Sequence, residues 1–236
     1  MKNKTKSISL TAIVPIYNEE KFIKKSVERL INENIFKEIL LVDDCSTDGS
    51  SKIAKKMQKE NISIKYLRTN KNSGKGSAIS SVKNFITSTH VVIHDSDLEY
   101  FPDDIVEMFE AANHNTDSLI LGSRFIGNKD RKNIYKRTVL ANNVISAFFS
   151  LINFYRISDV ATCYKLMPTK FFINENFKEK GFSIEIELLS KFLKFNKSVV
   201  EIPIKYEGRT YEEGKKIKTV DGFLYIYSIL KYRFFN

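Results

Sequence analysis

Hydrophobic residues in the first half of the chain follow two alternating patterns. Short runs rich in β-branched residues, typical of buried strands, occur at 9–14, 38–42, 63–67, 90–94 and 118–121. Between these runs, apolar residues recur every three or four positions, as helices require, at Ile23, Val27, Leu30 and Ile31 and again at Ile105, Met108, Phe109 and Ala112. This alternation predicts an α/β fold in which a mainly parallel sheet carries helices on both faces.

Two helix starts are marked by residues that favour helix N-termini. Asn18, followed by two glutamates, is expected to cap the first helix. Pro102, followed by two aspartates, is expected to open the helix that contains Met108. Proline fits the first turn of a helix, and acids are favoured at the positive end of the helix dipole.

The second half of the chain has a different pattern. We expect a long helix at 134–155, a second helix at 184–195, a strand at 198–204, a polar loop at 206–218 and a final amphipathic helix from residue 221. No repeat, low-complexity segment or linker separates the two halves. The sequence therefore predicts a single domain over residues 1–236, with a C-terminal α+β elaboration.

The composition is that of a soluble globular protein. Of the 236 residues, 42% are hydrophobic and 28% are charged, which argues against disorder. The longest nearly apolar run, at 145–155, is about half of the roughly 20 residues that a membrane-spanning helix needs. The apolar stretch at 8–17 lacks a small-residue cleavage site, and Cys45 and Cys163 are expected to be free thiols. We therefore expect a cytoplasmic protein.

The formal net charge of +10 favours an anionic partner, which can be a nucleotide, a phospholipid surface or a nucleic acid. Because the chain has only three histidines and no CxxC pair, a structural zinc site is excluded. The histidines, His90, His94 and His114, are expected to be packed or solvent-facing rather than catalytic.

Acidic residues follow three of the predicted strands. The first strand leads into Glu19, the second ends beside Asp44, and the fourth is followed by Asp95, Asp97 and Glu99. Ligands of such folds bind outside the carboxyl ends of the strands, where these acids should meet. Clustered carboxylates repel one another unless they share a cation, and oxygen ligands favour Mg²⁺ or Mn²⁺.

Six segments carry a further pattern: VPIYNEE (14–20), VDDCSTDGS (42–50), HDSDLEYFPDDI (94–105), GSRF (122–125), SDVATCYKLM (158–167) and EIPIKYEGRTYEEGKKI (201–217). Taken together and in this order, they resemble the family 2 glycosyltransferases with the GT-A fold, a Rossmann-like architecture. The resemblance is closest to the branch that includes dolichyl-phosphate mannose synthase and bacterial polyprenyl-phosphate glycosyltransferases, and it covers nearly the whole chain.

The resemblance implies that the first half, residues 8–122, binds a nucleotide-sugar donor linked to UDP or GDP. It implies that Pro15, Tyr17 and Glu19 line the nucleotide pocket and that Asp44 contacts the base or the ribose.

A glycine-rich turn at 72–77 precedes a further helix. It fails the Walker pattern because Thr69 stands where the first glycine is required. We expect Gly74 and Lys75 to lie near the donor, with Lys75 close to the diphosphate; a plain turn is the alternative.

The resemblance also implies that Asp95 and Asp97 bind Mg²⁺ or Mn²⁺, with Asp97 taking part in catalysis. Glu99 stands where close relatives often have a glutamine as a further metal ligand. An acid at this position adds negative charge and should tighten metal binding.

In the second half, residues 123–236, the resemblance implies an acceptor site. Arg124 matches an arginine near the acceptor phosphate, for which a catalytic role is expected, and Arg209 and Lys215 match basic residues of a mobile acceptor loop. Lys136, from the basic cluster at 124–137, is expected to join them. Arginine suits this task because its planar fork binds phosphate oxygens bidentately.

The need for a general base depends on the acceptor. A phosphate acceptor is already an anion, whereas a hydroxyl acceptor must lose a proton to a carboxylate. Asp159 and Glu185 are the candidates for that base, and Asp159 has the better motif support.

These features predict a metal-dependent, inverting glycosyltransferase that moves a sugar from a nucleotide-sugar donor to a polyprenyl phosphate. A hydroxyl of a saccharide, in cell-surface polysaccharide synthesis, is the alternative acceptor. The alternatives from other classes are a fold that only binds nucleotide sugars and a non-catalytic basic protein that binds nucleotides or nucleic acid. A surface that binds the phosphates of a nucleic acid would not carry acids at three strand ends, so no nucleic acid is expected.

Two aromatic-rich segments bear on surface contacts. Residues 148–155, beside the basic cluster at 124–137, suit an anionic lipid surface as well as ordinary core packing. Residues 225–235 suit core packing or a dimer contact. Peripheral contact with the inner face of the membrane and a homo-oligomer are therefore both open.

Overall fold

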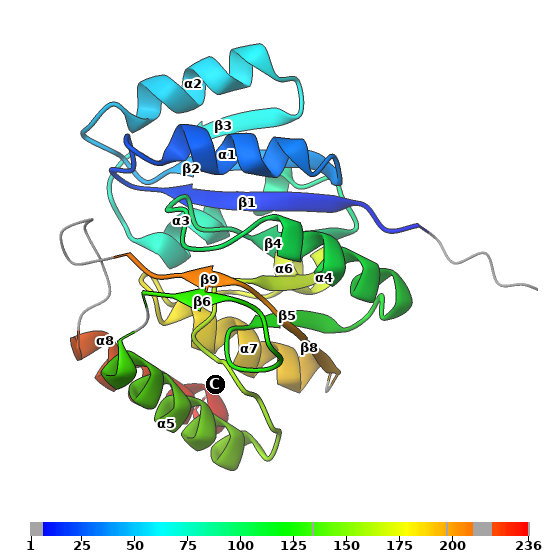
Figure 1. The fold of residues 1–236 in the computed structure, drawn as a ribbon, viewed down its shortest axis with the longest axis vertical. Coiled ribbons are helices and arrows are strands. Elements are labelled where there is room, and N and C mark those ends of the chain that lie inside the picture. Colours follow the sequence, from blue (N-terminus) through cyan, green and yellow to red (C-terminus); the bar gives the residue numbers. More distant parts are fainter. Residues whose placement is uncertain (1–6, 134, 197, 210–218, 236) are drawn as a thin grey trace, which may run out of the picture.

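A seven-stranded sheet runs through the molecule in the order β3-β2-β1-β4-β7-β5-β8 (Figure 1). The computed structural model describes residues 7–133, 135–196, 198–209 and 219–235, with only the backbone at 219–221. Neighbouring strands are parallel except at β7, which is antiparallel to both β4 and β5. The expected α/β fold with a mainly parallel sheet is confirmed.

The strands of this sheet are β1 (Leu10–Ile16), β2 (Phe36–Asp43), β3 (Ile64–Arg68), β4 (His90–Ile93), β5 (Leu119–Ser123), β7 (Lys165–Pro168) and β8 (Val199–Pro203). The α-helices are α1 (Ile23–Asn32), α2 (Ser50–Glu60), α3 (Lys75–Ser81), α4 (Asp103–His114), α5 (Lys136–Asn153), α6 (Thr169–Asn174), α7 (Ile184–Phe195) and α8 (Thr219–Phe234), with a 3₁₀ turn at Lys83–Phe85. Two short strands, β6 (Arg131–Lys132) and β9 (Tyr206–Glu207), pair as a separate small sheet.

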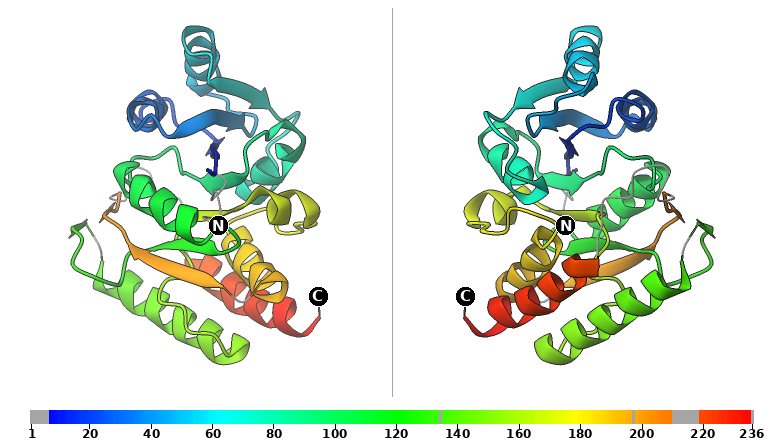
Figure 2. Two further views of the ribbon diagram at one scale, coloured as in Figure 1. Left: turned by 90° about the vertical axis from the view of Figure 1, so that its right-hand side faces the viewer. Right: turned by 90° about the vertical axis from the view of Figure 1, so that its left-hand side faces the viewer.

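Helices cover both faces of the large sheet. Figure 2 shows α1 and α4 on one face and α3, α6 and α7 on the other. The central strands β1 and β4 are buried along nearly their whole length, as strands covered on both faces must be. The parallel strands β1, β2 and β4 end at the same edge of the sheet, and the loops that follow them carry the acidic residues singled out from the sequence.

The expected helices and strands agree with the structure within a few residues, and α7 coincides with the helix expected at 184–195. The described part of the loop expected at 206–218 begins with the short strand β9, and its remainder from 210 lies outside the described residues. Strand β7 has no counterpart among the expected strands. Its four residues are too few to show a period, and they include Lys165, a charged residue that is 0% exposed.

The expectation that Asn18 caps the first helix is wrong. Helix α1 begins only at Ile23, and no acid lies in its first turn. Asn18 instead has a left-handed backbone, with φ 53°, and its side-chain oxygen accepts a hydrogen bond from the Thr47 amide at 2.8 Å. The residues before α1 therefore form a loop that is tied to the loop after β2. At α4 the expectation holds, because the helix follows Pro102 and has two aspartates in its first turn.

Two histidines are packed inside the fold, as expected. His94 shares hydrogen bonds with Ser26 and with the Tyr164 hydroxyl, each at 3.0 Å, and burial lowers its pKa to about 4. His90 contacts the Thr116 carbonyl oxygen at 2.8 Å. Both cysteines are free thiols. Within the described ranges, no helix combines the length and the apolar character needed to cross a bilayer.

Burial of Asp104 predicts a measurable dependence of stability on pH. Its side chain is 1% exposed, and burial raises its pKa from 3.8 to about 6, although the Lys205 amide donates to it at 2.7 Å. The folded protein therefore binds this proton more tightly than the unfolded chain. This contribution to the free energy of unfolding should fall by up to about 3 kcal/mol as pH rises from 4 to 6.

The substitution Asp104→Asn removes this titration. Denaturant unfolding of both proteins between pH 4 and 7 should show a difference in stability that changes across this interval. A constant difference would contradict the assignment.

Candidate active site

A cavity of about 280 Å³ opens at the carboxyl ends of β1, β2 and β4. This is the edge where α/β sheets bind ligands. Every residue expected at the donor or the metal lines it: Pro15, Tyr17, Glu19, Asp44, Gly74, Lys75, Asp95, Asp97 and Glu99. From the second half of the chain, Arg124, Glu185 and Arg209 also line it. The structure thus brings together residues far apart in the sequence, such as Glu19 and Arg209, which are 190 positions apart.

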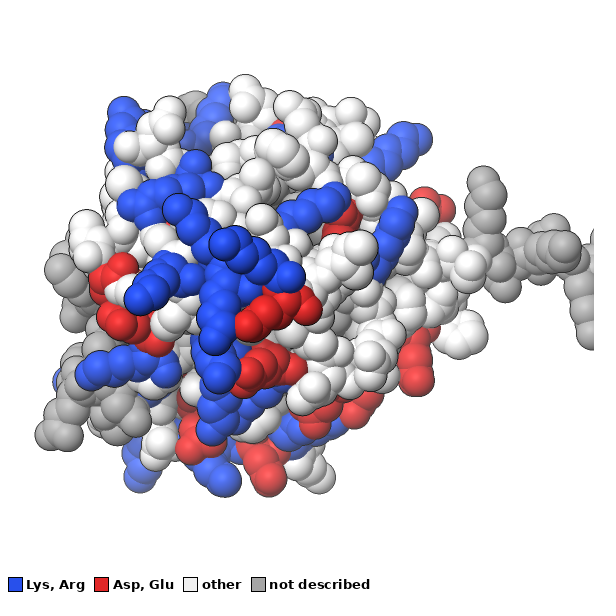
Figure 3. All heavy atoms as spheres, turned by 90° about the horizontal axis from the view of Figure 1, so that it is seen from above, with Lys and Arg blue, Asp and Glu red and all other residues white. Residues whose placement is uncertain are grey.

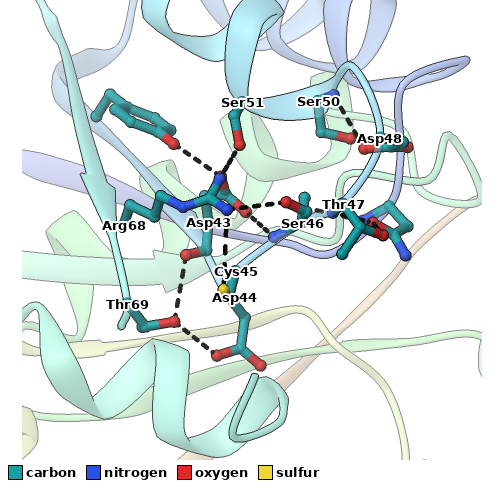
Figure 4. A network of polar contacts seen from close by, with 12 residues as sticks. Asp43, Asp44, Cys45, Ser46, Thr47, Asp48, Ser50, Ser51, Arg68 and Thr69 are labelled. Atoms are coloured by element: carbon teal, nitrogen blue, oxygen red, sulfur yellow. Dashed lines mark hydrogen bonds and ion pairs between the residues drawn. The ribbon is translucent and has the colours of Figure 1, made fainter. Parts of the chain in front are cut away.

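The loop after β2 is held by a buried aspartate that sequence reasoning did not single out. Asp43 is 0% exposed and accepts hydrogen bonds from the Ser46 amide, the Tyr66 hydroxyl and the Arg68 guanidinium, each at 2.7 Å. Burial alone would raise its pKa, but hydrogen bonds from Ser51 and Ser46 bring the pKa below its ordinary value. Figure 4 shows Arg68 and Ser51 converging on Asp43, which fixes the loop that carries Asp44.

Asp44 binds the protein's own backbone at the rim of the cavity. It accepts hydrogen bonds from the Thr69 hydroxyl at 3.0 Å and from the amides of Ser73 and Gly74 at 3.0 and 2.6 Å. Gly74 has φ +93°, and a Cβ there would lie 2.5 Å from the Lys180 carbonyl oxygen. Asp44 therefore anchors the glycine-rich turn, and the turn needs glycine at this position.

Asp95 and Asp97 each pair with a cationic side chain. The Lys75 ammonium lies 2.7 Å from Asp95 Oδ1, and the Arg209 guanidinium lies 2.9 Å from Asp97 Oδ2. Burial opposes the charge on Asp95, yet Lys75 holds its pKa below the ordinary value. Arg209 also contacts Glu19 at 2.9 Å, so it spans the cavity from one acid to the next.

Glu99 is held by two neighbours from the segment that leads into the expected acceptor loop. Its carboxylate accepts a hydrogen bond from the Tyr206 hydroxyl at 2.6 Å and from the Arg209 amide at 2.9 Å. Burial raises the pKa of Glu99 in spite of these contacts.

A chain of alternating charges runs from the cavity into the core. Lys75 contacts Glu185 at 2.8 Å as well as Asp95, and Lys165 contacts the second Glu185 oxygen at 2.6 Å. Burial opposes the charge on Lys75, but the acids around it raise its pKa well above the usual value. Both oxygens of Glu185, one of the two candidate bases, are thus engaged by lysines. Sequence reasoning also missed Lys165, because its only mark in the sequence is its place in a short apolar run.

Arg124 and Asp159 form a buried bidentate pair. The Arg124 Nε and Nη2 atoms lie 2.7 and 2.8 Å from the Asp159 oxygens, and the Arg124 amide donates to the same carboxylate at 3.1 Å. Asp159 is 0% exposed and does not line the cavity. In this structure the carboxylate of Asp159, expected as a candidate base, therefore holds the Arg124 guanidinium and does not line the cavity.

One expected acceptor residue, Lys136, is not brought to the cavity. Lys136 is exposed at the first position of α5 and does not line it. Lys215 lies outside the described residues.

The chemistry of the donor set fits a hard divalent cation that is shared with a substrate. Within the described part of the chain, no three His, Cys, Asp or Glu side chains are gathered closely enough to hold a metal ion by themselves. Mg²⁺, however, is often bound by one or two carboxylates together with substrate phosphates. Asp95 and Asp97, which line the cavity side by side in the sequence pattern Asp-x-Asp, meet that requirement.

Comparisons with known proteins agree with this geometry. A Methanococcus voltae protein, named UDP-N-acetylglucosamine–dolichyl-phosphate N-acetylglucosaminyltransferase, is 27% identical over 92% of this chain and 93% of its own length. An Edwardsiella ictaluri protein, named undecaprenyl-phosphate 4-deoxy-4-formamido-L-arabinose transferase, is 27% identical over 87% of this chain and 62% of its own.

Among solved structures, glucosyl-3-phosphoglycerate synthase from Mycobacterium tuberculosis, in complex with Mn²⁺, UDP and phosphoglyceric acid, superposes with a TM-score of 0.74 at 14% identity. The match covers 97% of this chain and 80% of that one, which supports the GT-A fold. The family model described as glycosyl transferase family 2 matches residues 11–175, more than half of the chain. The chain therefore belongs to glycosyl transferase family 2 and is a glycosyltransferase.

Proposed function

We propose that the protein transfers a sugar, with inversion at the anomeric carbon, from a UDP-linked donor to a polyprenyl phosphate, with Mg²⁺ or Mn²⁺ bound at Asp95 and Asp97. The observation that carries this proposal is the charge balance of the cavity, which six carboxylates and three cationic side chains line together. The name of the Methanococcus voltae relative supports both the donor and the acceptor, and the UDP bound in the mycobacterial structure supports the base.

The excess of carboxylates bears on the donor. A diphosphate entering a cavity with more acids than bases needs further positive charge. A divalent cation shared by Asp95, Asp97 and the diphosphate would supply it and would neutralise the leaving group as the sugar–phosphate bond breaks. Lys75, which pairs with Asp95, is in place to contact the same diphosphate once that carboxylate has another partner. Asp44 shapes the glycine-rich turn around the nucleotide.

The acceptor side carries the cations. Arg124 lines the cavity with its guanidinium fixed by Asp159, and Arg209 reaches in from the end of β9. A phosphate acceptor held there attacks the anomeric carbon from the face opposite the leaving group. Since this acceptor is already an anion, the reaction needs no general base.

The state of the two candidate bases favours a phosphate over a hydroxyl acceptor. Asp159 lies outside the cavity in a bidentate pair, and Glu185 is held between two lysines. Neither is placed to take a proton from a hydroxyl. We accordingly treat residues 8–122 as the donor half and 123–236 as the acceptor half of one domain, and we expect the enzyme to work at the inner face of a membrane, where a lipid-linked acceptor resides.

Asp95→Asn tests the metal and donor site. It keeps the shape of the side chain and removes its charge, so transfer should fall by about 10²–10³-fold. In thermal-shift measurements, UDP with Mn²⁺ should raise the wild-type Tm by roughly 5–10 °C and leave the variant unchanged. Asp117→Asn, at an exposed turn, is the matched control. Full activity in Asp95→Asn would refute the metal assignment.

A pair of substitutions separates orientation from proton transfer on the acceptor side. Arg124→Lys keeps the charge but loses the planar fork, so the KM for polyprenyl phosphate should rise about tenfold or more while UDP affinity stays constant. Asp159→Asn should reproduce this rise without altering the pH profile of kcat. If Asp159→Asn instead removes one limb of that profile, Asp159 is a general base and the acceptor assignment fails.

A further inference from the structure

Large apolar side chains are exposed along one side of α5. Leu140, Val144 and Leu151 of α5, and Phe154 directly after its end, are 66%, 56%, 69% and 84% exposed. The steps of four, seven and three residues between them correspond to one or two helical turns, so these side chains lie on one side. The other side of the same helix packs into the core through Ile145 and Phe149. A helix that faces water on one side normally carries polar residues there, and a helix that is apolar all round is normally covered.

Helix α8 has a second exposed apolar row beside the first. Phe223, Tyr227 and Phe234 are 72%, 64% and 62% exposed. The two helices lie side by side at the end of the molecule opposite α2 (Figures 1 and 2). A Cβ at Gly222, in the first turn of α8, would lie 4.0 Å from Ile145 Cδ1, near the middle of α5. At the other end, the Arg233 guanidinium lies 5.7 Å from the ring of Phe154, which follows α5. We call the exposed rows on these two helices the α5–α8 face.

The charged residues of α5, and those of α8 after Asp221, are all basic, although Lys231 pairs with Glu179 at 2.7 Å. No Asp or Glu occurs between residues 133 and 157 or between 222 and 235. Exposed Lys136 and Arg137 stand at the start of α5, and exposed Arg156 follows its end. The location of Lys136, which does not reach the cavity, thus fits a contact outside the active site.

The opposite end of the molecule shows that positive charge alone does not make such a face. Figure 3 shows lysines and acids intermingled over the end that carries α2. Lys24 and Glu28, and Lys56 and Glu60, form exposed pairs at 3.8 and 3.7 Å. The exposed side of α2 consists of charged and polar residues, so it is suited to water.

We infer that the α5–α8 face docks the protein on a bilayer of anionic phospholipid. Exposed apolar rows insert at the boundary of headgroups and acyl chains, and basic residues at their ends pair with lipid phosphates. A second copy of the chain on the same face would bring like charges together. The inference deepens the proposed function, because Tyr225 of α8 lines the cavity, and a bilayer at this helix lies close to the site where a lipid-linked phosphate would react.

Co-sedimentation with vesicles that contain no polyprenyl phosphate tests the inference. The wild type should bind vesicles of phosphatidylcholine with phosphatidylglycerol more tightly than phosphatidylcholine alone, and added salt should weaken the binding. The double variant Leu140→Ser/Leu151→Ser should bind about tenfold or more weakly, because two apolar side chains no longer insert. Phe223→Ser/Tyr227→Ser should have the same effect from α8.

Ile62→Ser is the matched control. Ile62 is fully exposed beyond the end of α2, far from this face, and its loss should leave binding unchanged. Equal Tm values for all variants would show that each protein is folded. Absence of binding by the wild type, or equal binding by the wild type and the Leu140→Ser/Leu151→Ser variant, overturns the inference. A wild-type dimer that the same substitutions dissociate, without vesicle binding, assigns the face to a second copy.

The vesicle experiment tests membrane docking independently of the proposed reaction, because the vesicles contain no polyprenyl phosphate and transfer is not measured. Vesicle binding by a protein that fails to glycosylate polyprenyl phosphate would keep the face and refute the reaction. Transfer to a lipid-linked acceptor without vesicle binding would support the reaction and refute docking through the α5–α8 face.

Discussion

The ion pairs between carboxylates and cations at the carboxyl edge of the sheet are the constraint on which the rest of the site depends. Asp95 and Asp97 lie in one cavity with four further acids, and the fold tolerates them because Lys75 and Arg209 neutralise them. These cations come from different parts of the chain, and Lys75 is itself fixed through Glu185 by fully buried Lys165. The same charges define the chemistry of the cavity in the proposed reaction, in which a metal and a diphosphate would replace these partners.

The fold could be predicted from the sequence to a large extent, because hydrophobic spacing and acidic strand ends are local signals. The residues expected at the donor line one cavity for the same reason, since most of them lie at or after the carboxyl ends of the strands. The pairings were not predictable. The Asp-x-Asp pattern does not reveal that Lys75 and Arg209 pair with the two acids. The motif that indicated Asp159 as a candidate base does not reveal that its carboxylate pairs with Arg124. Strand β7, which contains Lys165, was not predicted, because a strand of four residues that includes a buried lysine is too short to show an alternating hydrophobic pattern.

Residues from both halves of the chain line the same cavity. The residues proposed to bind the donor come mainly from the loops after β1, β2 and β4, while Arg124 and Arg209 enter from the half of the chain that also forms α5 and α8. Basic and acidic side chains are mixed at the α2 end, and apolar rows flanked by basic residues lie at the other. In the proposed reaction, this polarity would give a soluble nucleotide sugar and a lipid-linked phosphate separate approaches to one cavity.

The central claim is that the carboxylate excess makes donor and metal binding mutually dependent. Calorimetric titration of UDP into the wild-type protein, with Mn²⁺ and in the presence of a chelator, tests it most directly. The account predicts that Mn²⁺ strengthens UDP binding by at least about tenfold, which is roughly 1.4 kcal/mol of coupling, and that UDP strengthens Mn²⁺ binding by the same factor. Equal UDP affinity with and without the metal would contradict it.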